Sequence, residues 1–139
     1  MNILAPVDGS AYTQRMVAWL AAHHLLDAGH RVTFLHVIPP LPHRAAAFAT
    51  PDVVHQYYAD DARIVLDPLR EVMKTHGAEA RFEHHVGHAG ATIGQAADSG
   101  GHDLVVMGSH GHGTFANLVL GSVATQVLAS CRAPVLVIR

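Results

Sequence analysis

Short apolar runs alternate with stretches of helical spacing along the whole sequence, and this alternation constrains the fold more than any single motif. Helical spacing repeats every three to four residues, whereas the apolar runs are short and continuous. The apolar runs predict five strands, at residues 2–7, 31–38, 80–86, 103–107 and 134–138. Strands that alternate with helices are typical of a parallel sheet covered on both faces, so we expect an α/β fold.

The helices between these strands are expected to begin and end at recognisable residues. Ser10 is expected to cap the first helix and Gly29 to end it, while Pro68 either kinks the second helix or divides it in two. Residues 39–50 are rich in alanine and proline and predict a loop. Helical segments are predicted at residues 10–28, 50–76 and 91–99, and from the glycine-rich stretch to about residue 131.

Length and composition favour one soluble domain over residues 1–139. Half of the 139 residues are apolar and the formal net charge is −2, so no basic face for nucleic acid is expected. No apolar run reaches the length of a membrane span, and the first residues do not resemble a signal peptide. The single cysteine, Cys131, fits a reducing compartment, and we expect a cytoplasmic location.

Three glycines, Gly108, Gly111 and Gly113, directly follow the apolar run at residues 103–107. A strand, a glycine-rich turn and a helix can hold an anion on backbone N–H groups, but glycine content alone equally fits a simple turn. A phosphate-binding P-loop is excluded because residues 104–131 contain no lysine or arginine. Residues 111–116 match a relaxed dinucleotide fingerprint, yet they follow the fourth strand and lack a trailing acid, which indicates coincidence.

A longer spacing is more specific: Gly108, two residues, Gly111, nine residues, then Gly121 and Ser122. The chain here resembles the universal stress protein family, in its nucleotide-binding branch. The resemblance implies a three-layer α/β/α sandwich with a Rossmann-like, five-stranded parallel sheet of strand order 3-2-1-4-5. It covers the whole chain and also includes Val7-Asp8-Gly9-Ser10, His36-Val37, residues 105–111 and residues 133–137.

The resemblance also implies a site for ATP or another adenine nucleotide, with Mg²⁺ carried by the phosphates. Asp8 would accept hydrogen bonds from the ribose or the adenine. The resemblance implies that Ala5, Pro6, Val7 and Val37 line the adenine slot and that Met107 and Gly108 lie beneath the ribose. The backbone amides that would face the phosphates are those of Gly108, His110, Gly111, Gly121, Ser122 and Val123.

Gly121 falls within a helical pattern, where glycine costs roughly 1 kcal/mol relative to alanine. This indicates the close approach of a ligand or, alternatively, of the sheet. Two features depart from the family pattern: His110 and His112 stand where members often carry arginine, and Ala124 stands where some carry a hydroxyl. We therefore expect a Kd of about micromolar, about 8 kcal/mol, and an affinity that rises as pH falls from about 8 to about 6.

Other titratable residues are interpreted as structural or solvated. The 13 histidines are scattered, and their tightest groups, His110-x-His112 and His84-His85-x-x-His88, lack the partners of a zinc site. No metal site and no catalytic residue is predicted. Solvated helix faces are expected for Asp27, Asp60 and Asp61, and a small buried side chain for Cys131.

The resemblance implies a stress-response protein that acts by nucleotide binding and conformational signalling rather than by turnover. It further implies a homodimer in which the last strand, from Pro134 to Ile138, pairs with its twin, and such pairing would cover an apolar sheet edge. Three alternatives remain open. These are a dimeric partner-binding module of the same fold without a physiological nucleotide, a slow ATPase or adenylating enzyme, and a cyclic AMP binder.

Overall fold

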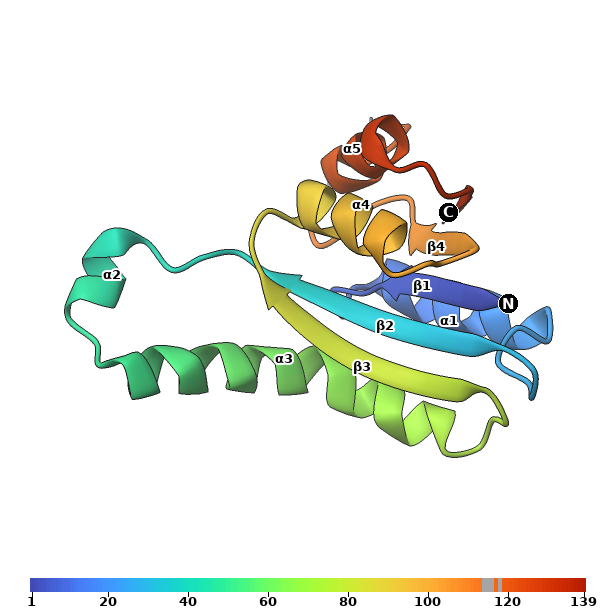
Figure 1. Ribbon diagram of the computed structural model, residues 1–139, viewed down its shortest axis with the longest axis horizontal. Coiled ribbons are helices and arrows are strands. Elements are labelled where there is room, and N and C mark those ends of the chain that lie inside the picture. The colour runs from blue at the N-terminus through green and yellow to red at the C-terminus, as the bar shows by residue number, and fades with distance from the viewer. Residues whose placement is uncertain (114–116, 118) are drawn as a thin grey trace.

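Five parallel strands form one sheet of order β3-β2-β1-β4-β5 in the computed structural model, which confirms the expected Rossmann-like fold (Figure 1). The structure describes residues 1–113, 117 and 119–139. The strands are β1 (Asn2–Pro6), β2 (Arg31–Ile38), β3 (Glu79–Val86), β4 (Leu104–Gly108) and β5 (Val135–Ile138). The helices are α1 (Ala11–Ala22), α2 (His43–Ala47), α3 (Pro51–Met73), α4 (Ala89–Ser99) and α5 (Ser122–Ser130).

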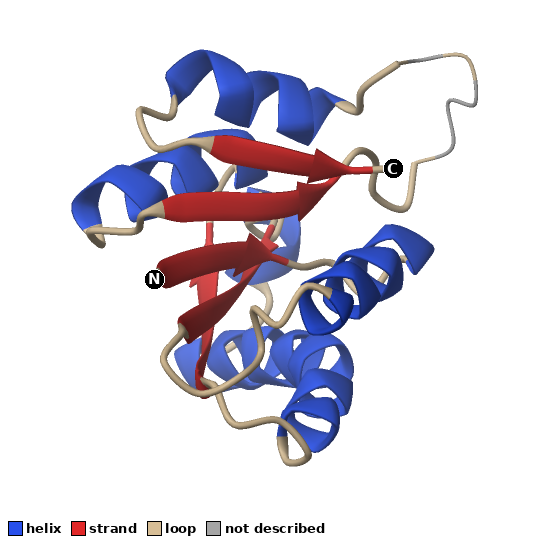
Figure 2. Ribbon diagram, turned by 90° about the vertical axis from the view of Figure 1, so that its right-hand side faces the viewer, coloured by secondary structure: helices blue, strands red, loops and turns tan. Residues whose placement is uncertain are grey.

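Helices cover both faces of the sheet, as Figure 2 shows. On one face, α1 and α3 bury a cluster that includes Met16, Leu66 and the fully buried Phe34 of β2. On the other face, α4 and α5 pack Ile93 and Val127 against the sheet. Because β1, β2 and β4 are covered on both sides, their sequences read as nearly continuous apolar runs.

The central position of β1 locates the crevice of the fold. Ile3 pairs with Val32 of β2 on one side and with Leu104 of β4 on the other. The strand order reverses between the adjacent strands β1 and β4. In open α/β sheets, ligands bind at such a reversal, beyond the carboxyl ends of the strands. Strand β3 lies at one edge and is mostly exposed, as its alternating sequence predicts.

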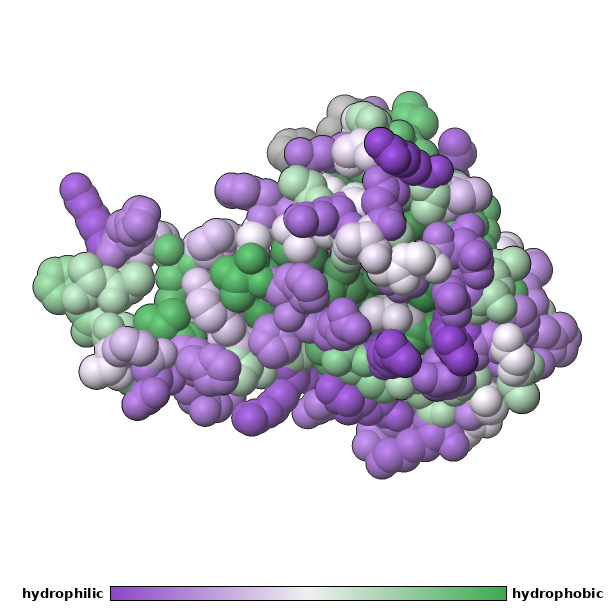
Figure 3. Space-filling model, in the orientation of Figure 1, coloured by the Kyte–Doolittle hydropathy of each residue, from purple (hydrophilic) through white to green (hydrophobic). Residues whose placement is uncertain are grey.

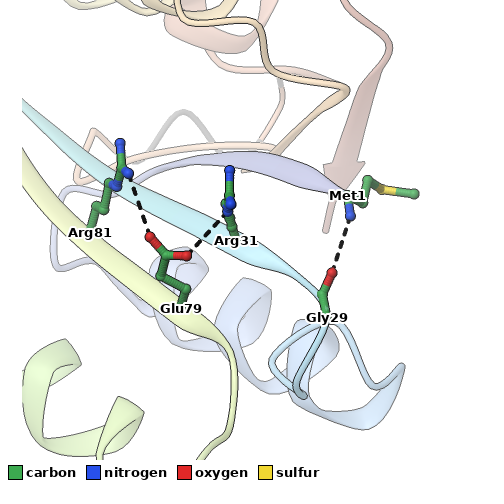
Figure 4. Close-up of polar contacts among 5 residues, drawn as sticks. All are labelled: Met1, Gly29, Arg31, Glu79 and Arg81. Atoms are coloured by element: carbon green, nitrogen blue, oxygen red, sulfur yellow. Dashed lines mark hydrogen bonds and ion pairs between the residues drawn. The ribbon is translucent and has the colours of Figure 1, made fainter.

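The end of the sheet at which the strands begin, opposite the crevice, carries exposed polar contacts (Figure 4). Glu79 accepts hydrogen bonds from Arg31 at 3.1 Å and from Arg81 at 3.5 Å, and the amino group of Met1 donates to Gly29 O at 3.4 Å. Exposed ion pairs of this kind contribute about 0–1 kcal/mol. The Arg31–Glu79 contact joins β2 to β3 at the end of the sheet opposite the crevice.

Two helical predictions need correction. The first helix ends at Ala22, not near residue 28, because the chain turns at His24, whose φ is 61°. Within the predicted loop, residues 43–47 form the short helix α2. Of the two alternatives for Pro68, division into two helices is excluded, since α3 runs from Pro51 to Met73 through it.

Helix α2 and the start of α3 project from the body of the molecule (Figure 1). In the space-filling view this projection carries pale-green, weakly hydrophobic surface, in contrast to the purple polar surface over much of the same face (Figure 3). Phe48, which follows α2, is 95% exposed. None of the helices in the described residues is both long enough and apolar enough to cross a membrane.

Candidate functional site

A cavity of about 720 Å³ opens beyond the carboxyl ends of β1, β2 and β4. Every site residue expected from the sequence lines it except Ala5, whose side chain is fully buried in the core beneath α1 and α3. Ala5 therefore supports the wall and does not face the cavity. The expected residues that line it are Pro6, Val7, Asp8, Val37, Met107, Gly108, His110, Gly111, Gly121, Ser122 and Val123.

Asp8 is held in one orientation at the centre of this cavity. Its Oδ1 accepts hydrogen bonds from the Ser10 N–H at 2.9 Å and from the Thr13 hydroxyl at 3.1 Å. Ser10 precedes α1 as expected, but its side chain makes no capping bond. The second oxygen, Oδ2, points toward Gly111, where an added Cβ would lie only 2.5 Å from it.

Gly121 precedes α5 and does not lie inside a helix, which corrects the sequence interpretation. At this position glycine is well tolerated, so no helix-interior penalty applies. Its N–H donates to Ser109 O at 2.7 Å, and the Ser109 N–H donates to Ile138 O at 2.7 Å. A Cβ on Gly121 would lie 3.1 Å from Ser109 O, so the close approach here is between two segments of the chain. The Gly121 amide is thus engaged by the protein.

The first turn of α5 supplies backbone N–H groups on the same side of the cavity. Ser122, Val123 and Ala124 line it and occupy the positions whose N–H groups have no partner within the helix. The positive end of the helix dipole adds to these donors, which suits an anion. The part of the predicted helix that falls at residues 114–116 and 118, and the third place of the dinucleotide fingerprint at residue 116, lie outside the described residues.

The ionisable side chains that line the cavity are two carboxylates and three imidazoles, and its described residues include no lysine or arginine. His112 donates from Nε2 to Asp8 O at 2.6 Å, and His110 Nδ1 lies 2.9 Å from Ser109 Oγ. The His110 ring also lies 5.2 Å from that of Tyr12. Across the described residues, no three His, Cys, Asp or Glu side chains are grouped as metal ligands.

A partly buried pair that was not predicted from the sequence lies at the cavity. His36 Nε2 lies 2.8 Å from Asp61 Oδ1, so Asp61, although 39% exposed, is not simply a solvated residue. The available signal was helical spacing, because Asp61 lies three residues after Tyr58 and four before Val65, on the face of α3 that packs inward. Asp60, its neighbour, is exposed and accepts hydrogen bonds from Gln56 and Arg63.

Apolar side chains of β2, α3 and α4 also line the cavity. They were not predicted from the sequence, because they come from elements that are far apart along the chain. Together with the polar residues above, the lining residues not expected from the sequence are Gly9, Thr13, Leu35, His36, Pro39, Asp61, Ile64, Val65, Ala89, Ile93, Ser109, His112, Gly113 and Ala124.

Cys131 lies away from the cavity, directly after α5, and is half-buried. Burial raises the pKa of its thiol, and nearby Asp98 acts in the same direction. Because the thiolate is the reactive form, iodoacetamide is expected to alkylate the folded protein several-fold more slowly at pH 8 than the same protein unfolded in denaturant. Equal rates in the two states, measured by mass spectrometry, would contradict this prediction.

The model of the universal stress protein family matches residues 1–139, the whole chain. The chain belongs to the universal stress protein family. Universal stress protein Slr1230 of Synechocystis is 30% identical over 139 residues, and a universal stress protein of Mycolicibacterium smegmatis is 28% identical over 142 residues. Each alignment covers 99% of this chain but only 42% and 47% of the relative, so the chain spans less than half their length.

Solved structures share the universal stress protein fold over the full chain. The structure of hypothetical protein MJ0577 has a TM-score of 0.84 at 26% identity and covers 99% of this chain and 94% of its own. An Archaeoglobus fulgidus universal stress protein in complex with dAMP has a TM-score of 0.70 at 22% identity, covering 100% and 98%. A universal stress protein in complex with cAMP has a TM-score of 0.72 at 20% identity, covering 100% and 97%.

Proposed function

We propose that this universal stress protein binds ATP or another adenine nucleotide in the cavity beyond β1, β2 and β4. The observation that carries the proposal is that one cavity is lined both by apolar side chains of β1, β2 and α3 and by the first turn of α5. A purine ring suits the apolar side chains, and phosphates suit the backbone donors of α5. The dAMP and cAMP complexes of proteins with the same fold support this assignment.

The residues that would contact the nucleotide follow from these two kinds of lining. Pro6, Val7 and Val37 would line the adenine, and Met107, near the end of β4, would lie beneath the ribose. Asp8 presents Oδ2 as an acceptor for a ribose hydroxyl. The phosphates would meet the loop and first-turn amides of Gly108, His110, Gly111, Ser122 and Val123, whereas the Gly121 amide would first have to leave Ser109 O.

We infer that the protein acts by binding and signalling rather than by turnover. Phosphoryl transfer generally uses lysine, arginine or metal-held groups to stabilise charge, and the described lining residues include no lysine or arginine. Magnesium would arrive on the phosphates, because Mg²⁺ keeps several waters and takes phosphate oxygens as ligands.

Binding is tested first by mass spectrometry of nucleotide released from the denatured protein, and then by calorimetry with ATP, AMP and cAMP. We expect a Kd of about micromolar for at least one of them. In Asp8→Asn the amide oxygen can keep the bonds to Ser10 and Thr13, but the amide nitrogen cannot accept from a ribose hydroxyl, so a loss of about tenfold is expected. The absence of binding by all three nucleotides at millimolar concentration would reject the proposal.

We also propose a homodimer through β5. This strand lies at the open edge of the sheet, and its Pro134 and Ile138 carbonyls accept from β4. Since backbone groups alternate in direction along a strand, those of Val135 and Val137 face outward and can pair with a second copy.

The dimer proposal makes a specific prediction. Val137→Pro removes one outward N–H and leaves the β4 ladder intact, so we expect a folded monomer. Val137→Ala keeps the N–H and is expected to remain dimeric. Light scattering after gel filtration measures both masses, and a wild-type mass of 14.8 kDa would contradict the dimer.

A further inference from the structure

His36 joins three elements at the base of the cavity. It is 7% exposed and stands near the end of β2, where Nδ1 lies 2.9 Å from Val7 O and Nε2 lies 2.8 Å from Asp61 Oδ1. Val7 forms part of the wall assigned to adenine and directly precedes Asp8. Asp61 lies on α3, and its side chain is 39% exposed at the cavity surface. One imidazole ring therefore connects β1 and α3 through β2.

Both partners of the His36 ring are hydrogen-bond acceptors. A backbone carbonyl only accepts, so Nδ1 must carry a hydrogen to bond Val7 O. An ionised carboxylate also only accepts, so Nε2 must carry a hydrogen to bond Asp61. A neutral imidazole has one N–H and can satisfy just one of the two contacts. The observed pair of distances is satisfied by the imidazolium form of His36 beside an ionised Asp61.

We propose that His36 is a proton-dependent positioning residue for the nucleotide site. In its doubly protonated form it joins Val7 to Asp61 and so fixes the adenine wall against α3. Loss of either ring proton would leave Val7 O or Asp61 without its hydrogen-bond donor and would loosen this wall. Nucleotide affinity would then be lower for the singly protonated ring than for the doubly protonated ring. This inference rests on the proposed nucleotide site.

The charged and titratable groups around His36 come from three elements. Asp61 faces it from α3, and Asp8 follows its acceptor Val7 after β1. His84 of β3 is the register partner of His36, on the exposed edge strand. Helices α4 and α5 pack on the other face of the sheet and supply no group on this side. Asp61 is thus the charged group in direct contact with the ring.

Nuclear magnetic resonance of ¹⁵N-histidine-labelled protein without ligand tests the proton count directly. The His36 ring, assigned with a His36→Asn variant, is expected to show hydrogens on both nitrogens while the contacts to Val7 and Asp61 are formed. A ring with a single hydrogen at every pH at which the protein is folded, as a protonated Asp61 would give, would overturn the proposal.

Adenosine binding tests the link between this proton and the site, because adenosine has no phosphate for His110 or His112 to attract. Wild-type affinity is expected to fall about tenfold over the pH range in which the spectra show the His36 ring losing one hydrogen. In Asp61→Asn the amide can donate to a neutral ring, so the pair persists and the pH dependence should disappear. Asp60→Asn, an exposed neighbour on the same helix, should keep the wild-type pH dependence.

The outcomes separate the two proposals. A wild-type adenosine affinity that stays constant while the His36 ring titrates would overturn the positioning role and leave the nucleotide site standing. A pH dependence that survives in Asp61→Asn would also overturn it. Failure of both adenosine and ATP to bind at any pH would reject the proposed function, and the positioning role with it. The ring spectra would still report whether His36 carries two protons.

Discussion

Replacing Gly111 with alanine is expected to weaken ATP binding by at least about tenfold while leaving the fold intact. The added Cβ would lie 2.5 Å from Asp8 Oδ2, far inside van der Waals contact. Asp8 cannot simply rotate away, because Ser10 and Thr13 hold its other oxygen. Either the glycine-rich loop moves outward or the carboxylate loses its orientation, and both changes displace groups that the nucleotide would contact.

Gly113 provides the matched control for this prediction. It belongs to the same loop and lines the same cavity, yet a Cβ placed on it would meet no described residue within 4 Å. Gly113→Ala is therefore expected to bind ATP within about twofold of wild type. Calorimetry gives both Kd values, and thermal unfolding shows whether the variants stay folded. Equal Kd values for Gly111→Ala and wild type would contradict the proposed role of the Asp8–Gly111 contact.

The sheet could be predicted from the sequence because its signals are local. Strands buried on both faces appear as short apolar runs, and the predicted and observed bounds of β2 coincide. The end of α1 could not be predicted in the same way. Leu25 and Leu26 continue the helical spacing, and Leu26 is fully buried, but the chain reaches that position through a turn at His24. Apolar spacing reports which residues are buried and does not report the backbone path that brings them there.

The lining of the cavity was predictable where glycines and Asp8 carry a family spacing, and not where contacts join distant segments. The sequence locates Gly121 but cannot show that its amide bonds Ser109 or that it precedes α5. Similarly, His36 and Asp61 are 25 residues apart and meet only after α3 packs on β2. Pairs of this kind depend on tertiary packing, so a single sequence gives the two residues without their contact.

Truncating the Phe34 side chain is expected to have the largest effect on stability. Phe34 is fully buried in the centre of β2 and stacks on Phe82 with ring centroids 5.5 Å apart. Phe34→Ala removes this contact and leaves a cavity between the sheet and the α1–α3 layer, which costs about 3–5 kcal/mol in the free energy of unfolding. Since small domains are stable by only about 5–15 kcal/mol, the variant should unfold at much lower denaturant concentration.

Phe48 allows the same substitution to be made at an exposed position. It is 95% exposed beside α2, so Phe48→Ala removes the same atoms from a side chain that is already in water. The expected change in unfolding free energy is within about 0.5 kcal/mol. Urea unfolding followed by circular dichroism measures both variants. Similar losses at the two positions would show that burial against the sheet does not set the stability of this fold, because the two substitutions differ only in what surrounds the ring.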